Sequence, residues 1–169
     1  FRVAHRSRVQ LHVPDIADAG EVHDHPLEAQ AEAGVPVKTP RIARDNHIEL
    51  WYVGGNNISN IDYIPDHKLT LPLYYSCDWD YDGLKIYERL QDRFARKSKS
   101  ITLLYPSPIL RKSVDSPEHN SRWKHDQPFS GLIRSAYSQE AISLIQDLIA
   151  QDEWVEEETC ELIEMVKLT

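Results

Sequence analysis

The strongest constraint on the fold is a strand-like run that leads through an acidic turn into an amphipathic helix. Residues 69–77 read LTLPLYYSC and are almost continuously apolar or aromatic, which is typical of a strand covered on both faces. From Gly83 to about Lys97 an apolar stripe recurs at helical spacing, formed by Leu84, Tyr87, Leu90 and Phe94. Residues 101–105, ITLLY, are again strand-like. This order of strand, helix and strand predicts an α/β fold with a parallel sheet flanked by helices.

The segments on either side extend this pattern. Residues 48–53, IELWYV, predict a strand that ends in a tight turn at Gly54 and Gly55, and residues 58–64 predict a short helical turn. A loop-rich stretch follows at 106–134, then a helix at 138–150 and an acidic helix at about 155–167. Residues 1–46 have no sustained periodicity. We therefore expect an N-terminal segment of unassigned fold, 1–46, followed by an α/β domain, 47–169.

Composition excludes several classes of protein. The chain has 169 residues, of which 41% are hydrophobic, so it can bury a core without disulfides. Its two cysteines, Cys77 and Cys160, form neither a zinc motif nor a disulfide framework, which favours a reducing cytoplasm. Membrane insertion is not expected, because no run reaches the ~18 apolar residues that would span a bilayer and no secretory leader opens the chain.

The distribution of charge is more informative than the net charge of -8. Residues 152–164 hold seven acidic residues and no lysine or arginine, whereas residues 84–125 hold ten basic residues against four acidic ones. A basic middle section of this kind could follow a phosphate backbone. The alternative is that these charges are the solvated faces of an ordinary α/β protein.

Three acidic residues alternate where the expected strand meets the expected helix: Asp78, Asp80 and Asp82. Carboxylates two residues apart leave the same face of an extended chain, so they can converge on one hard cation. Oxygen ligands suit Mg²⁺, which prefers a few carboxylates together with water and phosphate oxygens. The alternative interpretation is that Asp82 caps the helix while Asp78 and Asp80 only solvate a loop.

A calcium-binding EF-hand is excluded as the source of this acidic run. Counted from Asp78, the twelfth position of such a loop should be a bidentate glutamate, and it is Arg89. The segment that enters the loop should also be a helix, whereas residues 69–77 are strand-like.

The run YYSCDWDYDGLKIYERL resembles the Toprim domain, particularly that of the topoisomerase VI A subunit and the Wadjet plasmid-defence nuclease subunit. The pattern of that branch is DxDPxGxxI, and Asp78, Asp80, Gly83 and Ile86 match it, with Tyr81 in place of proline. The Glu-rich segment 154–158 is similar to the ending of Wadjet-like members. The resemblance covers roughly residues 48–164 and implies a Toprim-like, Rossmann-like parallel sheet.

This chain departs from the Toprim pattern at one acidic position. The family carries a glutamate just after its first strand, where this chain has Gly54 or Gly55. One possibility is that the acid comes from elsewhere, with Glu156, Glu157 and Glu158 as candidates. The others are an altered active site, or a domain that binds DNA without cutting it.

The activity implied by the resemblance is cleavage or strand transfer at a DNA phosphodiester, with Mg²⁺, or Mn²⁺ in its place, held by Asp78 and Asp80. Lys85, Arg89 and Arg93 would hold flanking phosphates. The setting implied is defence against plasmids or phages, with DNA and other subunits of a complex as partners. The alternative is a catalytically weakened DNA-binding or assembly module.

A polar loop supplies further candidates for the same site. His119, Ser121 and His125 follow the 101–105 strand, and ligands of parallel sheets gather at the carboxyl ends of the strands. We expect these three side chains either to line the cleft that contains Asp78 or to be ordinary loop residues.

Overall fold

A computed structural model describes residues 58–64, 67–117 and 119–168. The expected strand at 48–53, the turn at Gly54 and Gly55 and the N-terminal segment 1–46 lie outside the described residues.

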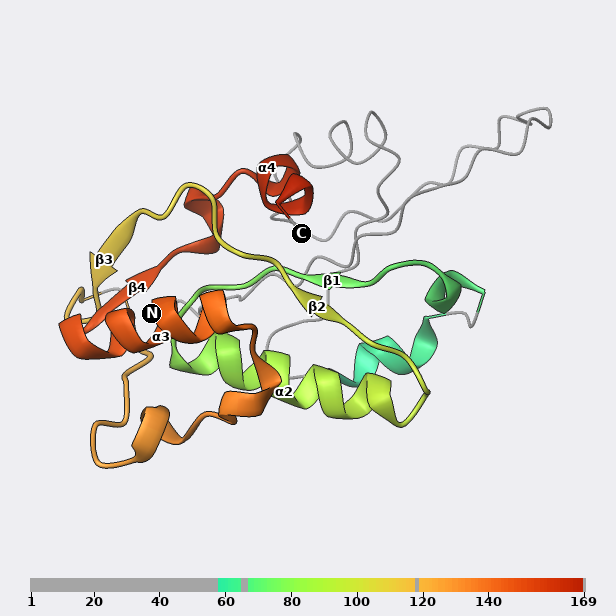
Figure 1. The fold of residues 1–169 in the computed structure, drawn as a ribbon, viewed down its shortest axis with the longest axis horizontal. Helices are drawn as coiled ribbons and strands as arrows, with labels where there is room; N and C mark the ends of the chain where they lie inside the picture. Colours follow the sequence, from blue (N-terminus) through green and yellow to red (C-terminus); the bar gives the residue numbers. More distant parts are fainter. Residues whose placement is uncertain (1–57, 65–66, 118, 169) are drawn as a thin grey trace.

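Short 3-10 helices (η), strands and α-helices alternate along the described chain (Figure 1). In order they are η1 (Ile58–Tyr63), η2 (Lys68–Thr70), β1 (Tyr74–Tyr75), α2 (Tyr81–Ala95), β2 (Thr102–Leu103), β3 (Arg111–Ser113), η3 (Pro128–Gly131), η4 (Arg134–Ala136), α3 (Gln139–Gln151), β4 (Glu153–Val155), η5 (Glu157–Thr159) and α4 (Leu162–Lys167).

Strand β1, helix α2 and strand β2 form the expected strand-helix-strand unit. The two strands pair in parallel, with Tyr74 opposite Thr102 and Tyr75 opposite Leu103. Figure 1 shows α2 and α3 on one side of this pair and α4 on the other. The mixed α/β class is therefore confirmed. The strands are shorter than the apolar runs predicted, and residues 68–70 form η2 instead of strand.

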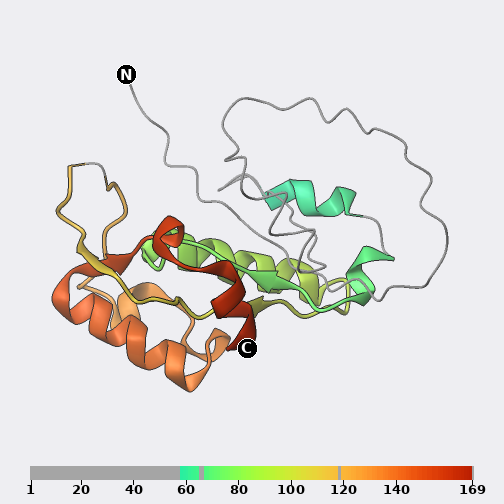
Figure 2. The same cartoon turned by 90° about the horizontal axis from the view of Figure 1, so that it is seen from above.

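A second, antiparallel pair was not predicted. Strand β3 lies within the stretch that was expected to be loop, and it pairs with β4, Lys112 opposite Trp154. The expected helix at 155–167 was wrong in its first half, because the backbone of Val155 pairs with that of Trp79. The Trp79 nitrogen lies 2.8 Å from the Val155 oxygen, and the Val155 nitrogen lies 3.4 Å from the Trp79 oxygen. That pairing holds residues 153–155 extended, and α4 begins only at Leu162 (Figure 2).

The core lies between α2, α3 and the strands. The predicted stripe of α2 is confirmed: Leu84, Tyr87, Leu90 and Phe94 are all buried. The rings of Tyr75 and Tyr87 stack with their centroids 5.8 Å apart, which fixes α2 against β1. From α3, Ile145 and Leu148 complete the core. Among the described helices none is long and apolar enough to cross a membrane.

Candidate functional site

The acidic run lies where β1 passes into α2, and Asp80 caps that helix. Asp80 has an extended backbone, and its Oδ1 accepts a hydrogen bond from the Gly83 N–H at 2.7 Å. This is an N-cap interaction, which satisfies one of the amides that a helix leaves without an intrahelical partner. The helix cap is therefore Asp80 and not Asp82, the residue proposed above as the alternative to a metal ligand.

The turn at the start of α2 requires glycine at position 83. A Cβ atom added to Gly83 would lie 2.1 Å from the Asp78 carbonyl oxygen, and that neighbour is backbone, which cannot move aside cheaply. The glycine of the acidic motif therefore has a steric role. It lets the start of α2 pack directly on the backbone of Asp78, in the segment that follows β1.

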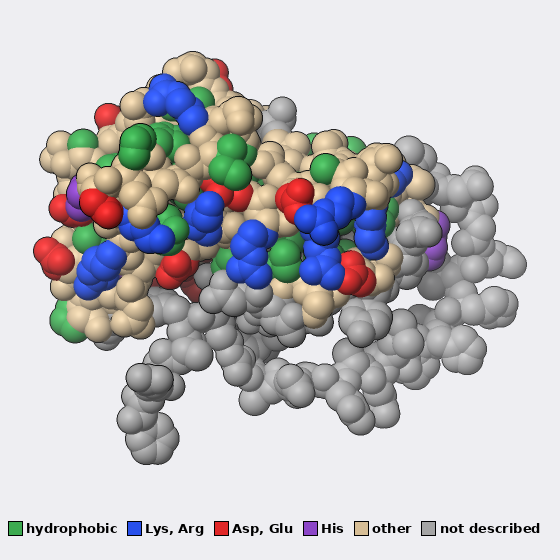
Figure 3. All heavy atoms as spheres, turned by 90° about the horizontal axis from the view of Figure 1, so that it is seen from below, with side chains coloured by type: hydrophobic (Ala, Val, Ile, Leu, Met, Phe, Trp, Pro, Cys, Tyr) green, Lys and Arg blue, Asp and Glu red, His purple; other side chains and the backbone are tan. Residues whose placement is uncertain are grey.

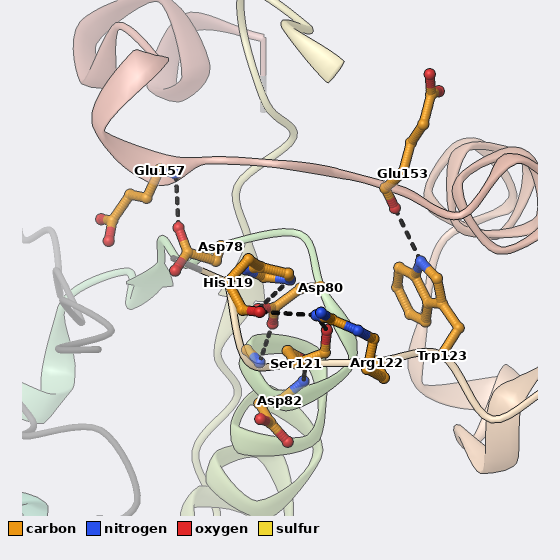
Figure 4. A network of polar contacts seen from close by, with 10 residues as sticks. Asp78, Asp80, Asp82, His119, Ser121, Arg122, Trp123, Glu153 and Glu157 are labelled. Carbon is orange, nitrogen blue, oxygen red and sulfur yellow. Dashed lines mark hydrogen bonds and ion pairs between the residues drawn. The ribbon is translucent and has the colours of Figure 1, made fainter. Parts of the chain in front are cut away.

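Asp78 joins this turn to the segment after β4. The residue is 8% exposed, and its Oδ1 accepts a hydrogen bond from the Glu157 N–H at 2.8 Å (Figure 4). Of the three glutamates proposed for the missing acid, Glu157 is buried and lies next to Asp78. Glu156 instead pairs with Lys112, and Glu158 is exposed. The contact to Asp78 is made by the backbone of Glu157.

Burial and neighbouring charge disfavour ionisation of Asp80. Burial raises the pKa of Asp80 from 3.8 to about 7, and the negative charges of Asp78 and Asp82 add to the rise. Hydrogen bonds from the Gly83 amide and the Ser121 hydroxyl oppose it. Two buried carboxylates therefore lie within reach of each other's charge, and a cation would relieve their repulsion.

Asp82 is not part of this buried pair. It is exposed in the first turn of α2, and in Figure 4 its carboxylate points away from Asp78 and Asp80. Its backbone N–H donates to the Ser121 Oγ at 3.0 Å. The structure therefore brings together two of the three aspartates that the sequence proposed as metal ligands.

Residues 119–124, here called the strap, run past the start of α2. His119 is buried, its ring stacks on Trp154 at a centroid distance of 3.9 Å, and its Nε2 lies 3.6 Å from the Asp80 Oδ2. Ser121 contacts both Asp80 and the Asp82 amide. Two of the three loop candidates therefore lie at the acidic site. The third does not, because His125 pairs with Asp152, Nε2 to Oδ1 at 2.7 Å.

The basic residues nominated on α2 are largely engaged with acids. Lys85 pairs with Glu88. Arg93 donates to the Asp62 carboxylate from Nη2 and from Nε, the latter at 3.1 Å from Oδ1. Arg89 is exposed. Figure 3 shows basic side chains in a row with acidic ones among them. They line a groove of about 620 Å³ together with Arg96 and Lys97. The charge of this face is mixed, which weakens its attraction for phosphate.

The side chains that could hold a metal ion at this place are those of Asp78 and Asp80. Within residues 58–64, 67–117 and 119–168, no three His, Cys, Asp or Glu side chains are arranged so that they could hold a metal ion. Two carboxylates still fit Mg²⁺, which completes its shell with water and phosphate oxygens. Gly54 and Gly55, where Toprim domains carry their glutamate, lie outside the described residues.

Comparison with known proteins adds no assignment. No family model matches the chain, and neither the curated proteins nor the solved structures contain a significant match.

Proposed function

We propose that this chain is a Toprim-type domain that acts on DNA phosphodiesters with Mg²⁺ bound at Asp78 and Asp80. The observation that carries the proposal is the buried pair of carboxylates at the junction of β1 and α2. Both lie within a strand-helix-strand unit, and each has one oxygen fixed by a backbone amide, from Glu157 and from Gly83. Such fixed ligands keep their geometry when a charged substrate arrives.

The two aspartates would have distinct tasks. Asp78 links the strand end to the β4 side of the site, so its orientation depends on contacts from both halves of the chain. Asp80 is tied to the helix start, and the pKa of about 7 means that a cation must displace a proton from it near neutral pH. Bound Mg²⁺ would neutralise charge on the phosphate and on the leaving oxygen.

A second candidate is a DNA-binding or assembly module with little or no catalytic activity, acting within a multi-subunit defence complex. The observation in its favour is that the described residues provide two carboxylate ligands and no third. A site with fewer fixed ligands binds the cation more weakly and places it less firmly.

Plasmid nicking separates the two candidates. The full chain is incubated with supercoiled plasmid and Mg²⁺ or Mn²⁺, beside the Asp78→Asn/Asp80→Asn double variant. Asparagine keeps the shape and the helix cap, so loss of cutting would report loss of charge. Asp92→Asn, an exposed carboxylate on the same helix, serves as the control and should cut normally. If the wild-type chain binds DNA without cutting it with either metal, the binding module is the better description.

A further inference from the structure

We propose that Arg122 and Lys124, the two exposed basic residues of the strap, bind the DNA phosphates nearest to the acidic pair. This inference rests on the proposed function, and it moves the main phosphate contact from the α2 face to the strap. The reason is that the strap is fixed next to Asp80, whereas Lys85 and Arg93 on α2 are already paired with acids.

The strap is held at one end by the site and at the other by neighbouring elements of the fold. At one end His119 stacks on Trp154 and Ser121 accepts from the first turn of α2. At the other, the Trp123 Nε1 donates to the Glu153 carbonyl at 2.8 Å and the Lys124 N–H donates to the Ser130 Oγ at 2.5 Å. The backbone beneath the two basic side chains is therefore fixed, which limits the entropy lost when they bind a phosphate.

Arg122 is oriented by its own loop. Its Nη1 donates to the carbonyls of His119 at 2.8 Å and Ser121 at 2.9 Å, and the side chain is exposed. Among the described residues its remaining guanidinium nitrogens have no hydrogen-bond acceptor. A guanidinium anchored on one nitrogen can present the others to a phosphate oxygen. Figure 4 shows this side chain beside Asp80 and His119.

Lys124 is positioned by the residue that departs from the Toprim pattern. Its Nζ lies 4.3 Å from the centre of the Tyr81 ring, and Tyr81 stands between Asp80 and Asp82 where the family has proline. A hydrogen bond to the Tyr81 side chain, with smaller contributions from Asp126 and Asp82, raises the pKa of Lys124. Tyr81 thus places the Lys124 ammonium beside the first turn of α2, next in sequence to Asp80, and proline has no aromatic ring with which to do so.

The salt dependence of DNA binding tests this assignment. The affinity of the full chain for a short labelled DNA duplex is measured in EDTA at salt concentrations between about 50 and 200 mM. In a plot of log affinity against log salt concentration, each phosphate contact contributes nearly one to the slope. We expect Arg122→Gln/Lys124→Gln to lower that slope by about two. The control Lys99→Gln/Lys167→Gln removes the same charge from positions outside both the strap and the α2 groove and should leave the slope unchanged.

A double-mutant cycle tests the role of Tyr81. Tyr81→Leu should lower the slope by about one in the wild-type chain and have no effect in Lys124→Gln. Tyr81→Phe keeps the ring but removes the hydroxyl, so its slope should lie between those of the wild type and Tyr81→Leu. A strap variant with the wild-type slope, or a chain that does not bind DNA, would overturn the inference. Normal plasmid nicking by that variant would leave the proposed function intact. Conversely, if the wild-type chain binds DNA through the strap but does not nick it, only the proposed cleavage activity is refuted and the strap inference stands.

Discussion

Replacing Asp80 with asparagine should stabilise the protein at neutral and alkaline pH. In the folded chain the Asp80 carboxyl holds its proton up to a pKa of about 7, whereas in the unfolded chain it releases it near 3.8. The unfolded state therefore binds fewer protons between these two values, and wild-type stability falls as the pH rises through that range. Each tenfold change in proton affinity is worth about 1.4 kcal/mol, so the loss is on the order of 4 kcal/mol above pH 7.

Asparagine isolates this effect because it retains the other function of the side chain. It accepts the Gly83 amide as a helix cap about as well as aspartate does. Urea unfolding of wild type and Asp80→Asn is compared in steps from pH 4 to pH 8. We expect similar free energies of unfolding at the acidic end and a growing advantage for the variant toward pH 8. Parallel curves across the range would show that Asp80 ionises normally, which would refute the argument from burial and repulsion.

Added Mg²⁺ provides an independent arm of the same experiment. At pH 8 a cation bound between the ionised carboxylates should raise wild-type stability, by about 2.7 kcal/mol at one hundred times its dissociation constant. Asp80→Asn should gain much less, since one ligand has lost its charge. Equal gains in both proteins would place the cation elsewhere.

Two further substitutions test the packing around the site. Gly83→Ala should destabilise the fold by roughly 1 to 3 kcal/mol, because the new Cβ would lie 2.1 Å from the Asp78 carbonyl oxygen. Thermal denaturation measures this loss, and an unchanged melting temperature would contradict the close approach. Glu88→Ala should lower the free energy of unfolding in urea by about 3 kcal/mol. Glu88 is buried and accepts hydrogen bonds from Lys85, from the Ile133 amide at 2.5 Å and from the Tyr137 hydroxyl at 3.0 Å. A loss below about 1 kcal/mol would show that those contacts are weak.

Local patterns in the sequence predicted the elements that depend on neighbouring residues. The stripe of α2 repeats every three or four residues, so its buried face could be read directly, and Ser138 marked the start of α3, where its Oγ accepts from the Ala141 amide. The strand-helix-strand order followed from the same reasoning. Asp78 and Asp80 could be nominated because alternate residues leave one face of an extended chain.

The tertiary structure decided how those residues are used, because the deciding contacts join distant parts of the chain. The Glu157 amide that fixes Asp78 is 79 residues away from it, and Ser121 is 39 residues from Asp82. No local period encodes such pairs, nor the contact with Trp79 that turned an expected helix at Val155 into strand. Burial likewise exists only in the folded chain, so the raised pKa of Asp80 and the position of Lys124 over Tyr81 could be seen only there.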